Sequence, residues 1–85
     1  VANAWAGVEA GAATLDASIA GIGGCPFAPN ATGNVATEDV QYMLQRSGVE
    51  TGLKLQGLIE TAQWLSTKMG RTLPGLVSRA GGFPK

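Results

Sequence analysis

The sequence contains no histidine, a single cysteine and few charged residues. Charged side chains make up 14% of its 85 residues, and six Lys and Arg balance six Asp and Glu. A protein that binds nucleic acid carries a basic face, and a membrane-surface anchor carries Lys or Arg clusters beside an apolar stripe. Because the chain has neither feature, we expect no nucleic-acid partner and no membrane partner.

The single cysteine, Cys25, excludes an internal disulfide, and without a histidine it also excludes a self-contained zinc site. An unpaired cysteine is typical of a reducing compartment, so the sequence predicts a cytoplasmic protein. No basic segment precedes the alanine-rich start, which argues against a signal peptide. No apolar run reaches the about 18 residues that a membrane span needs.

Bulky apolar side chains are also scarce. The hydrophobic share is 45%, but the 13 glycines and the many alanines add almost no side-chain volume. Chains below about 70–80 residues rarely gain more than about 3–5 kcal/mol from one core. Together with Val1 in place of an initiator methionine, this thin core favours an excerpt of a longer polypeptide, whose upstream chain we expect as a partner.

The hydrophobic pattern predicts three helices and one strand. Helices are expected over 2–12, 34–47 and 53–69, where apolar residues recur at three- and four-residue steps. Residues 14–20 alternate apolar and polar side chains with a period of two, which predicts a strand. The tail, rich in proline and glycine, predicts a short turn of helix followed by irregular chain.

Residues 21–34 form the longest stretch without periodicity, with four glycines and two prolines. Loops longer than about 12–15 residues in compact domains are usually functional or disordered. This loop retains Cys25 and Asn34 where a solvated linker would carry Ser and Lys, so we predict an active-site loop. A strand, a glycine-rich loop and a helix in this order form the repeating unit of α/β barrels, whose chemistry lies in such loops.

Cys25 is the first candidate for chemistry, because it lies between Gly24 and Pro26. The glycine lets a ligand approach closely, and the proline fixes the chain that follows. A thiol is mostly protonated at neutral pH, which suits proton donation to a carbanion as well as nucleophilic attack. The alternative is a buried and inert cysteine, which a loop of this composition disfavours.

Polar residues at the end of the loop allow more than one explanation. Asn34 offers an amide oxygen to a hard cation, although spacing alone favours a helix cap, for which Thr37 is a second candidate. Glu38 and Asp39 fit the first turn of a helix, where the helix dipole favours anions, better than an acid/base pair. The Gly-Ile-Gly-Gly run at 21–24 is a weak phosphate-binding pattern, because no Lys or Arg follows nearby.

The run from Ser18 to Phe27, Ser-Ile-Ala-Gly-Ile-Gly-Gly-Cys-Pro-Phe, closely resembles the signature of 3-hydroxy-3-methylglutaryl-CoA lyases. The resemblance continues through 31–39 and 42–44, and it covers roughly residues 2–65. Related metal-dependent barrels that condense rather than cleave, such as isopropylmalate and homocitrate synthases, typically carry Glu-Arg where this loop has Cys-Pro. The cysteine therefore favours the lyases.

This resemblance implies an α/β fold in which residues 1–85 are the C-terminal segment of a (β/α)8 TIM barrel: helix 7, strand 8, the active-site loop, helix 8 and an extra C-terminal helix. It implies metal-dependent retro-Claisen cleavage of 3-hydroxy-3-methylglutaryl-CoA to acetyl-CoA and acetoacetate, with Mg²⁺ or Mn²⁺, in a homo-oligomer. A lyase for a related acyl-CoA such as citramalyl-CoA, and a non-catalytic barrel fragment that acts as an assembly module, are the alternatives.

For individual residues, the resemblance implies that Cys25 protonates the departing acetyl-CoA enolate. It implies Asn34 as one metal ligand and Glu38 as a nearby supporting carboxylate of the catalytic site. It also implies a loop that closes over the substrate and excludes water, shaped by Gly21, Gly23, Gly24 and Pro26. The family's other ligands, an Asp and a His-x-His, have no counterpart in this sequence, so we expect the chain alone to be inactive.

Overall fold

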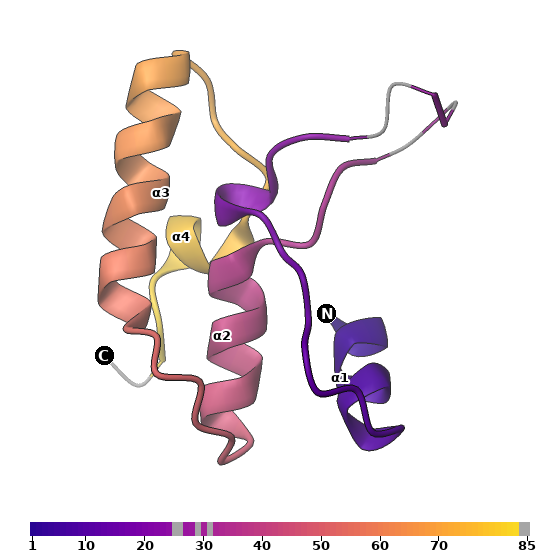
Figure 1. Cartoon of the computed structure of the whole chain (residues 1–85). Helices are drawn as coiled ribbons and strands as arrows, with labels where there is room; N and C mark the ends of the chain where they lie inside the picture. The colour runs from indigo at the N-terminus through magenta and orange to yellow at the C-terminus, as the bar shows by residue number, and fades with distance from the viewer. Residues whose placement is uncertain (25–26, 29, 31, 84–85) are drawn as a thin grey trace.

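The computed structural model describes residues 1–24, 27, 28, 30 and 32–83. The elements in this part of the chain are four α-helices and one 3-10 turn (Figure 1): α1 (Ala2–Glu9), η1 (Ile19–Gly21), α2 (Thr37–Arg46), α3 (Leu55–Met69) and α4 (Leu76–Ala80). The three predicted helices are confirmed, although each is shorter than expected. The short helical turn predicted in the tail is α4.

The strand predicted over 14–20 does not form among the described residues. Ser18 forms a single parallel bridge with Ala36, and the chain then turns directly into η1. The bridge consists of the Ser18 N–H bonded to the Val35 carbonyl at 3.0 Å and the Thr37 N–H bonded to the Ser18 carbonyl at 2.9 Å. An isolated strand is unstable without neighbours, and the described residues provide no further extended segment for it to pair with.

The helices form a thin layer around a core of small side chains. α2 and α3 pack against each other and against both α4 and η1, whereas α1 packs mainly on α2 (Figure 1). The described chain measures 35 × 35 × 17 Å, and its radius of gyration of 13.1 Å exceeds the about 12 Å of a compact chain of this length. Its central cluster contains Ala20, Ala62 and Leu73, flanked by Ile19, Ile22 and Leu65. This confirms the expectation of a thin core.

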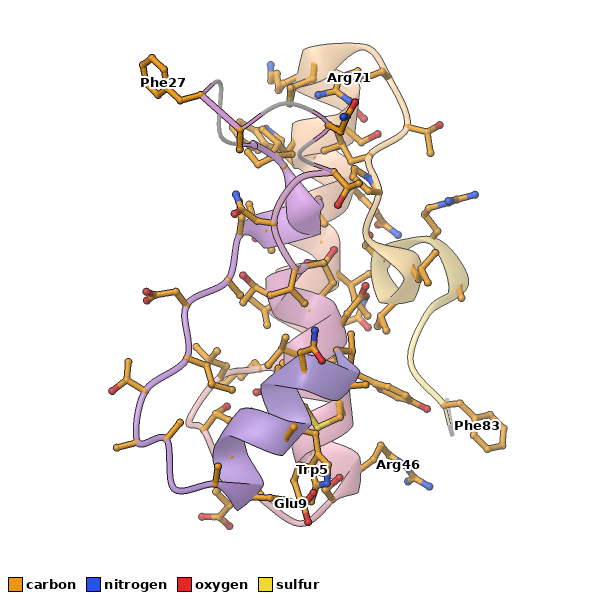
Figure 2. All side chains as sticks on the ribbon, turned by 90° about the vertical axis from the view of Figure 1, so that its right-hand side faces the viewer. Trp5, Glu9, Phe27, Arg46, Arg71 and Phe83 are labelled. Carbon is orange, nitrogen blue, oxygen red and sulfur yellow. The ribbon has the colours of Figure 1, made fainter. Side chains whose placement is uncertain are left out.

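Several large apolar side chains remain on the surface of this layer. Those at least two-fifths exposed are Val1, Phe27, Leu53, Trp64, Met69, Leu76 and Phe83. Figure 2 shows that Phe27 and Phe83 both point away from the helices. In the described part of the chain, no helix has the length and apolar character that crossing a membrane requires.

Glycines follow the C-terminal ends of α2 and α3, whereas the start of α2 differs from the prediction. Gly70 ends α3 in the left-handed conformation, with φ 68°, and Gly48 does the same after α2 with φ 81°. The N-cap of α2 is Ala36, and no side chain caps the helix. The predicted caps at Asn34 and Thr37 are therefore wrong, because the Asn34 amide is bonded within the loop.

Candidate active-site loop

The two ends of the loop at 21–34 run side by side and form a narrow neck that points away from the helices (Figure 1). A Cβ added to Gly33 would lie 2.8 Å from the carbonyl oxygen of Gly23, and one added to Gly23 would lie 2.9 Å from Nδ2 of Asn34. The φ angles of Gly23 and Gly33, +95° and +107°, lie in the region that L side chains rarely adopt. The neck therefore requires glycine at both positions.

The other predicted loop residues differ in how strongly the structure requires them. Gly21 is buried with φ +74°, and an added Cβ would lie 3.2 Å from the Asn34 carbonyl oxygen. At Gly24 an added Cβ would meet the main chain of Gly33 at an ordinary 3.7 Å, so space alone does not require glycine there. Cys25 and Pro26 lie outside the described residues.

Gly33 is a neck residue that the sequence reasoning did not include in the site. The sequence feature that points to Gly33 is its position directly before Asn34, in a loop whose other three glycines are predicted site residues. Which glycines of a loop face each other depends on how its two ends meet. The local pattern does not contain that information.

The side chain of Asn34 ties the two ends of the loop together. Its Nδ2 donates a 2.9 Å hydrogen bond to the carbonyl oxygen of Ile22. Since a carbonyl oxygen can only accept, this bond fixes which end of the amide is nitrogen. The Asn34 Oδ1 receives no hydrogen bond from the described residues, so it is available as a hard oxygen ligand of the type that Mg²⁺ and Mn²⁺ prefer.

The described residues supply only part of a metal centre. They contain no group of three or more His, Cys, Asp or Glu side chains that could hold an ion. Mg²⁺ demands near-octahedral coordination by oxygen, which one amide oxygen does not provide. Asn34 therefore fits a divalent cation as one ligand among others that come from outside these residues.

Glu38 lies at the start of α2 with its side chain 0% exposed. Its Oε1 accepts a 2.8 Å hydrogen bond from the backbone N–H of Ala20, and its Oε2 has no hydrogen-bond partner in the described structure. A buried carboxylate is costly unless it is bonded, and the first turn of α2 places it where the helix dipole favours a negative charge. Glu38 thus binds the backbone of Ala20, the residue directly before the loop.

Ala20 has an unusual backbone at the start of the loop. It is fully buried, and its φ of 59° and ψ of 6° lie in the left-handed region, which costs a non-glycine residue about 1–2 kcal/mol. Its N–H is bonded to Glu38, and its carbonyl accepts the N–H of Gly75 at 2.8 Å. Both backbone polar groups of Ala20 are bonded to residues distant in the sequence, which stabilises the strained conformation.

Asp39 lies in the first turn of α2 as expected, but it also binds a second helix. Its Oδ2 accepts the N–H of Leu76 at 3.1 Å, and its Oδ1 accepts the N–H of Val77 at 2.8 Å. These groups belong to the first turn of α4, where N–H groups lack partners within the helix. No local signal predicts this contact, because the partners are 37 and 38 positions apart.

Comparison with known proteins agrees with the resemblance of the loop. Residues 1–65 match the family model described as HMGL-like. The (R)-citramalyl-CoA lyase of Chloroflexus aurantiacus is 50% identical over 80 residues, which are 94% of this chain and 25% of that protein. Hydroxymethylglutaryl-CoA lyase YngG of Bacillus subtilis is 43% identical over 74 residues, 87% of this chain and 25% of that protein. The chain spans about a quarter of the length of these relatives.

Solved structures give the same result. An HMG-CoA lyase from Acinetobacter baumannii, in complex with coenzyme A and 3-methylmalate, superimposes with a TM-score of 0.94 at 38% identity, over 99% of this chain and 28% of that one. The Bacillus subtilis HMG-CoA lyase has a TM-score of 0.84 at 40% identity, over 93% of this chain and 26% of that one. Family and neighbours imply a TIM barrel. The chain belongs to the HMGL-like family.

Proposed function

We propose that this chain is part of a metal-dependent acyl-CoA lyase and that it supplies the loop that closes the active site. The observation that carries the proposal is the neck at Gly23 and Gly33, where the Asn34 amide is held with its oxygen free for a ligand. The family match and the relatives named as lyases support the same activity. A loop with a fixed neck is suited to closing over a substrate and excluding water.

In the proposed fold, α1 is helix 7 of the barrel, the extended chain before η1 is strand 8, α2 is helix 8, and α3 is the extra C-terminal helix. The segment before η1 has only its bridge from Ser18 to Ala36, at the start of α2, so in this proposal its strand neighbours come from the rest of the barrel. The thin layer and its exposed apolar side chains agree with a surface that packs on more chain. The partner is then the remainder of the barrel, in a homo-oligomer.

In the proposed reaction, the hydroxyl of a 3-hydroxyacyl-CoA loses its proton and becomes the ketone of the leaving product. The bond between the α and β carbons breaks, and its electron pair forms the enolate of acetyl-CoA. The Cys25 thiol gives its proton to the α carbon of this enolate, which yields acetyl-CoA. The hydroxyl proton passes to a general base in the rest of the proposed barrel, and a proton returned to the Cys25 thiolate restores the starting state. The electron pairs stay within the substrate, so no oxidant or reductant is needed.

The other residues of this chain hold the site in place. The Asn34 oxygen would be one ligand of a divalent cation such as Mg²⁺ or Mn²⁺, which supplies Lewis-acid charge for the substrate's oxygens when bound. The Asn34 N–H keeps the neck closed through the Ile22 carbonyl. Glu38 supports the beginning of the loop from inside the protein through Ala20.

Two substrates and one non-catalytic role compete within this proposal. We take 3-hydroxy-3-methylglutaryl-CoA as the substrate, since the relatives named for this activity come from bacteria and vertebrates at 40–44% identity. Citramalyl-CoA is the second candidate, because the 50% identical relative is named as a lyase for its (R) form. A fragment that serves only as an assembly module is the alternative outside catalysis.

The test uses the full-length protein that contains this sequence. It is incubated with 3-hydroxy-3-methylglutaryl-CoA or citramalyl-CoA in the presence of Mg²⁺ or Mn²⁺, and acetyl-CoA is measured by chromatography. We expect acetyl-CoA from one thioester, and loss of the activity in EDTA with recovery when metal is returned. A folded protein that releases no acetyl-CoA from either thioester would favour the assembly module.

A further inference from the structure

The segment at 73–78 lies beyond the residues that match the family model, yet it contacts the start of the active-site loop. After α3 the chain runs back to η1 before it enters α4 (Figure 1). Leu73 is buried in the cluster that contains Ala20, and the Gly75 N–H donates a 2.8 Å hydrogen bond to the Ala20 carbonyl. The 73–78 segment therefore contacts Ala20, the residue directly before the loop.

Gly75 is closely surrounded on the side where a side chain would be. An added Cβ would lie 2.5 Å from Oε2 of Glu38, 3.1 Å from Cα of Ala20 and 3.1 Å from Oγ of Ser78. The backbone itself does not demand glycine, because φ is −57°. Glycine is needed here for space, and the group that occupies this space is the carboxylate that binds Ala20.

Hydrogen bonds from Asp39 and from Ser78 hold the 73–78 segment in place beside the start of the loop. The Asp39 carboxylate binds the backbone N–H groups of Leu76 and Val77, and the Ser78 hydroxyl donates to the Gly75 carbonyl at 3.1 Å. Asp39 follows Glu38 directly on α2, so adjacent carboxylates bind the 73–78 segment and the start of the loop. A shift of one is expected to be transmitted to the other.

We propose that the 73–78 segment is a positioning element for the active-site loop and that Gly75 is its central positioning residue. The Gly75 N–H binds the carbonyl of Ala20, and the missing side chain of Gly75 leaves room for the Glu38 carboxylate that binds the Ala20 N–H. These two hydrogen bonds fix the left-handed backbone of Ala20, from which the loop leaves the core. This inference rests on the proposed function, because it assigns a catalytic consequence to the direction of the loop.

The test compares Gly75→Ala with Gly57→Ala in the full-length protein. Gly57 lies in α3, and an added Cβ would meet nothing within 4 Å, so this control adds the same methyl group without a contact. Hydrogen exchange of peptides covering 19–24 reports the Ala20 amide, and acetyl-CoA release gives kcat and KM. For Gly75→Ala we expect at least about tenfold faster exchange at Ala20 and about tenfold lower kcat, with KM within about twofold, because small displacements of a catalytic loop are costly. Gly57→Ala should change neither.

A double-mutant cycle tests whether Gly75→Ala lowers kcat by displacing the Glu38 carboxylate. If Gly75→Ala acts by displacing the Glu38 carboxylate, it should lower kcat by less than about twofold in a Glu38→Ala background. An equal loss in both backgrounds, or unchanged exchange at Ala20 in folded Gly75→Ala, would overturn the proposal. A simple loss of global stability would speed exchange throughout the protein rather than at 19–24, and it would equally overturn the proposal.

Two further measurements keep the outcome decisive. If Gly75→Ala does not fold, Ser78→Ala removes the bond to the Gly75 carbonyl without adding an atom. It should speed exchange at Ala20 by about two- to fivefold, since one neutral hydrogen bond is lost, and unchanged exchange would overturn the proposal. If the wild-type protein releases no acetyl-CoA, the proposed function fails, and the exchange data still decide whether the segment positions the loop.

Discussion

The backbone amide of Ala20 donates a 2.8 Å hydrogen bond to the buried Oε1 of Glu38, across 18 positions of the sequence. Ala20 is the last residue before the glycine-rich run of the loop, and Glu38 lies in the first turn of the helix that follows the loop. This bond therefore closes the base of the loop from within the core. The Asn34 amide closes its neck from the other side through the Ile22 carbonyl.

Replacing Glu38 with Ala should destabilise the full-length protein. The substitution leaves the buried Ala20 N–H without an acceptor, which costs about 1–3 kcal/mol, and it removes a contact that stabilises a strained backbone. Urea denaturation measures the change in the free energy of unfolding. The matched control is Glu9→Ala, whose carboxylate is exposed at the end of α1 and should contribute less than about 0.5 kcal/mol. Equal effects of the two substitutions would show that the buried bond contributes nothing.

Gly33→Ala should be far more harmful than Gly11→Ala. Both glycines have a similar positive φ, +107° and +103°, which strains an alanine at either position. At Gly11 an added Cβ meets nothing within 4 Å, whereas at Gly33 it would lie 2.8 Å from the Gly23 carbonyl oxygen. We expect Gly11→Ala to cost about 1 kcal/mol in stability and to retain activity. Gly33→Ala should lower kcat by at least about tenfold, because the neck must open; comparable kcat values would contradict a closed neck.

Two substitutions at Asn34 separate its two roles. Asn34→Ala removes the ligand oxygen and the bond to Ile22, and it should weaken Mn²⁺ binding by at least about tenfold. Asn34→Asp retains an oxygen ligand but cannot donate to the Ile22 carbonyl, so it should bind Mn²⁺ nearly as well and yet lower kcat. Isothermal titration with Mn²⁺ and steady-state kinetics measure both quantities. Equal loss of Mn²⁺ affinity in the two variants would exclude the amide oxygen as a ligand.

Cys25→Ala tests the proposed proton donor. Removing a general acid lowers the rate by about 10²–10⁴, and we expect a loss of this size in kcat without a change in the melting temperature. Cys25→Ser keeps a similar shape but carries a far weaker acid, so it should be nearly as impaired as Cys25→Ala. Turnover of the serine variant close to that of the wild type would show that the proton comes from another group.

The elements that the sequence predicted well are those with a local signal. α2 and α3 follow from apolar residues at helical spacing, and the left-handed backbone of Gly48 and Gly70 is found at their ends. The glycines and prolines of 21–34 agree with irregular chain at 22–24 and 32–35. The strand predicted over 14–20 does not form among the described residues, because alternation describes an extended chain, whereas a strand also needs neighbours to bond with.

The candidate site divides in the same way. The glycines and Asn34 of the 21–34 loop predicted a functional loop, and the run from Ser18 to Phe27 indicated the family. The partners of Glu38, Asp39 and Gly75 were beyond prediction, because each bond joins segments at least 18 positions apart. Local patterns specify which backbone conformations a segment can adopt; which buried carboxylate meets which amide depends on how the helices pack, and here that packing sets the direction of the loop.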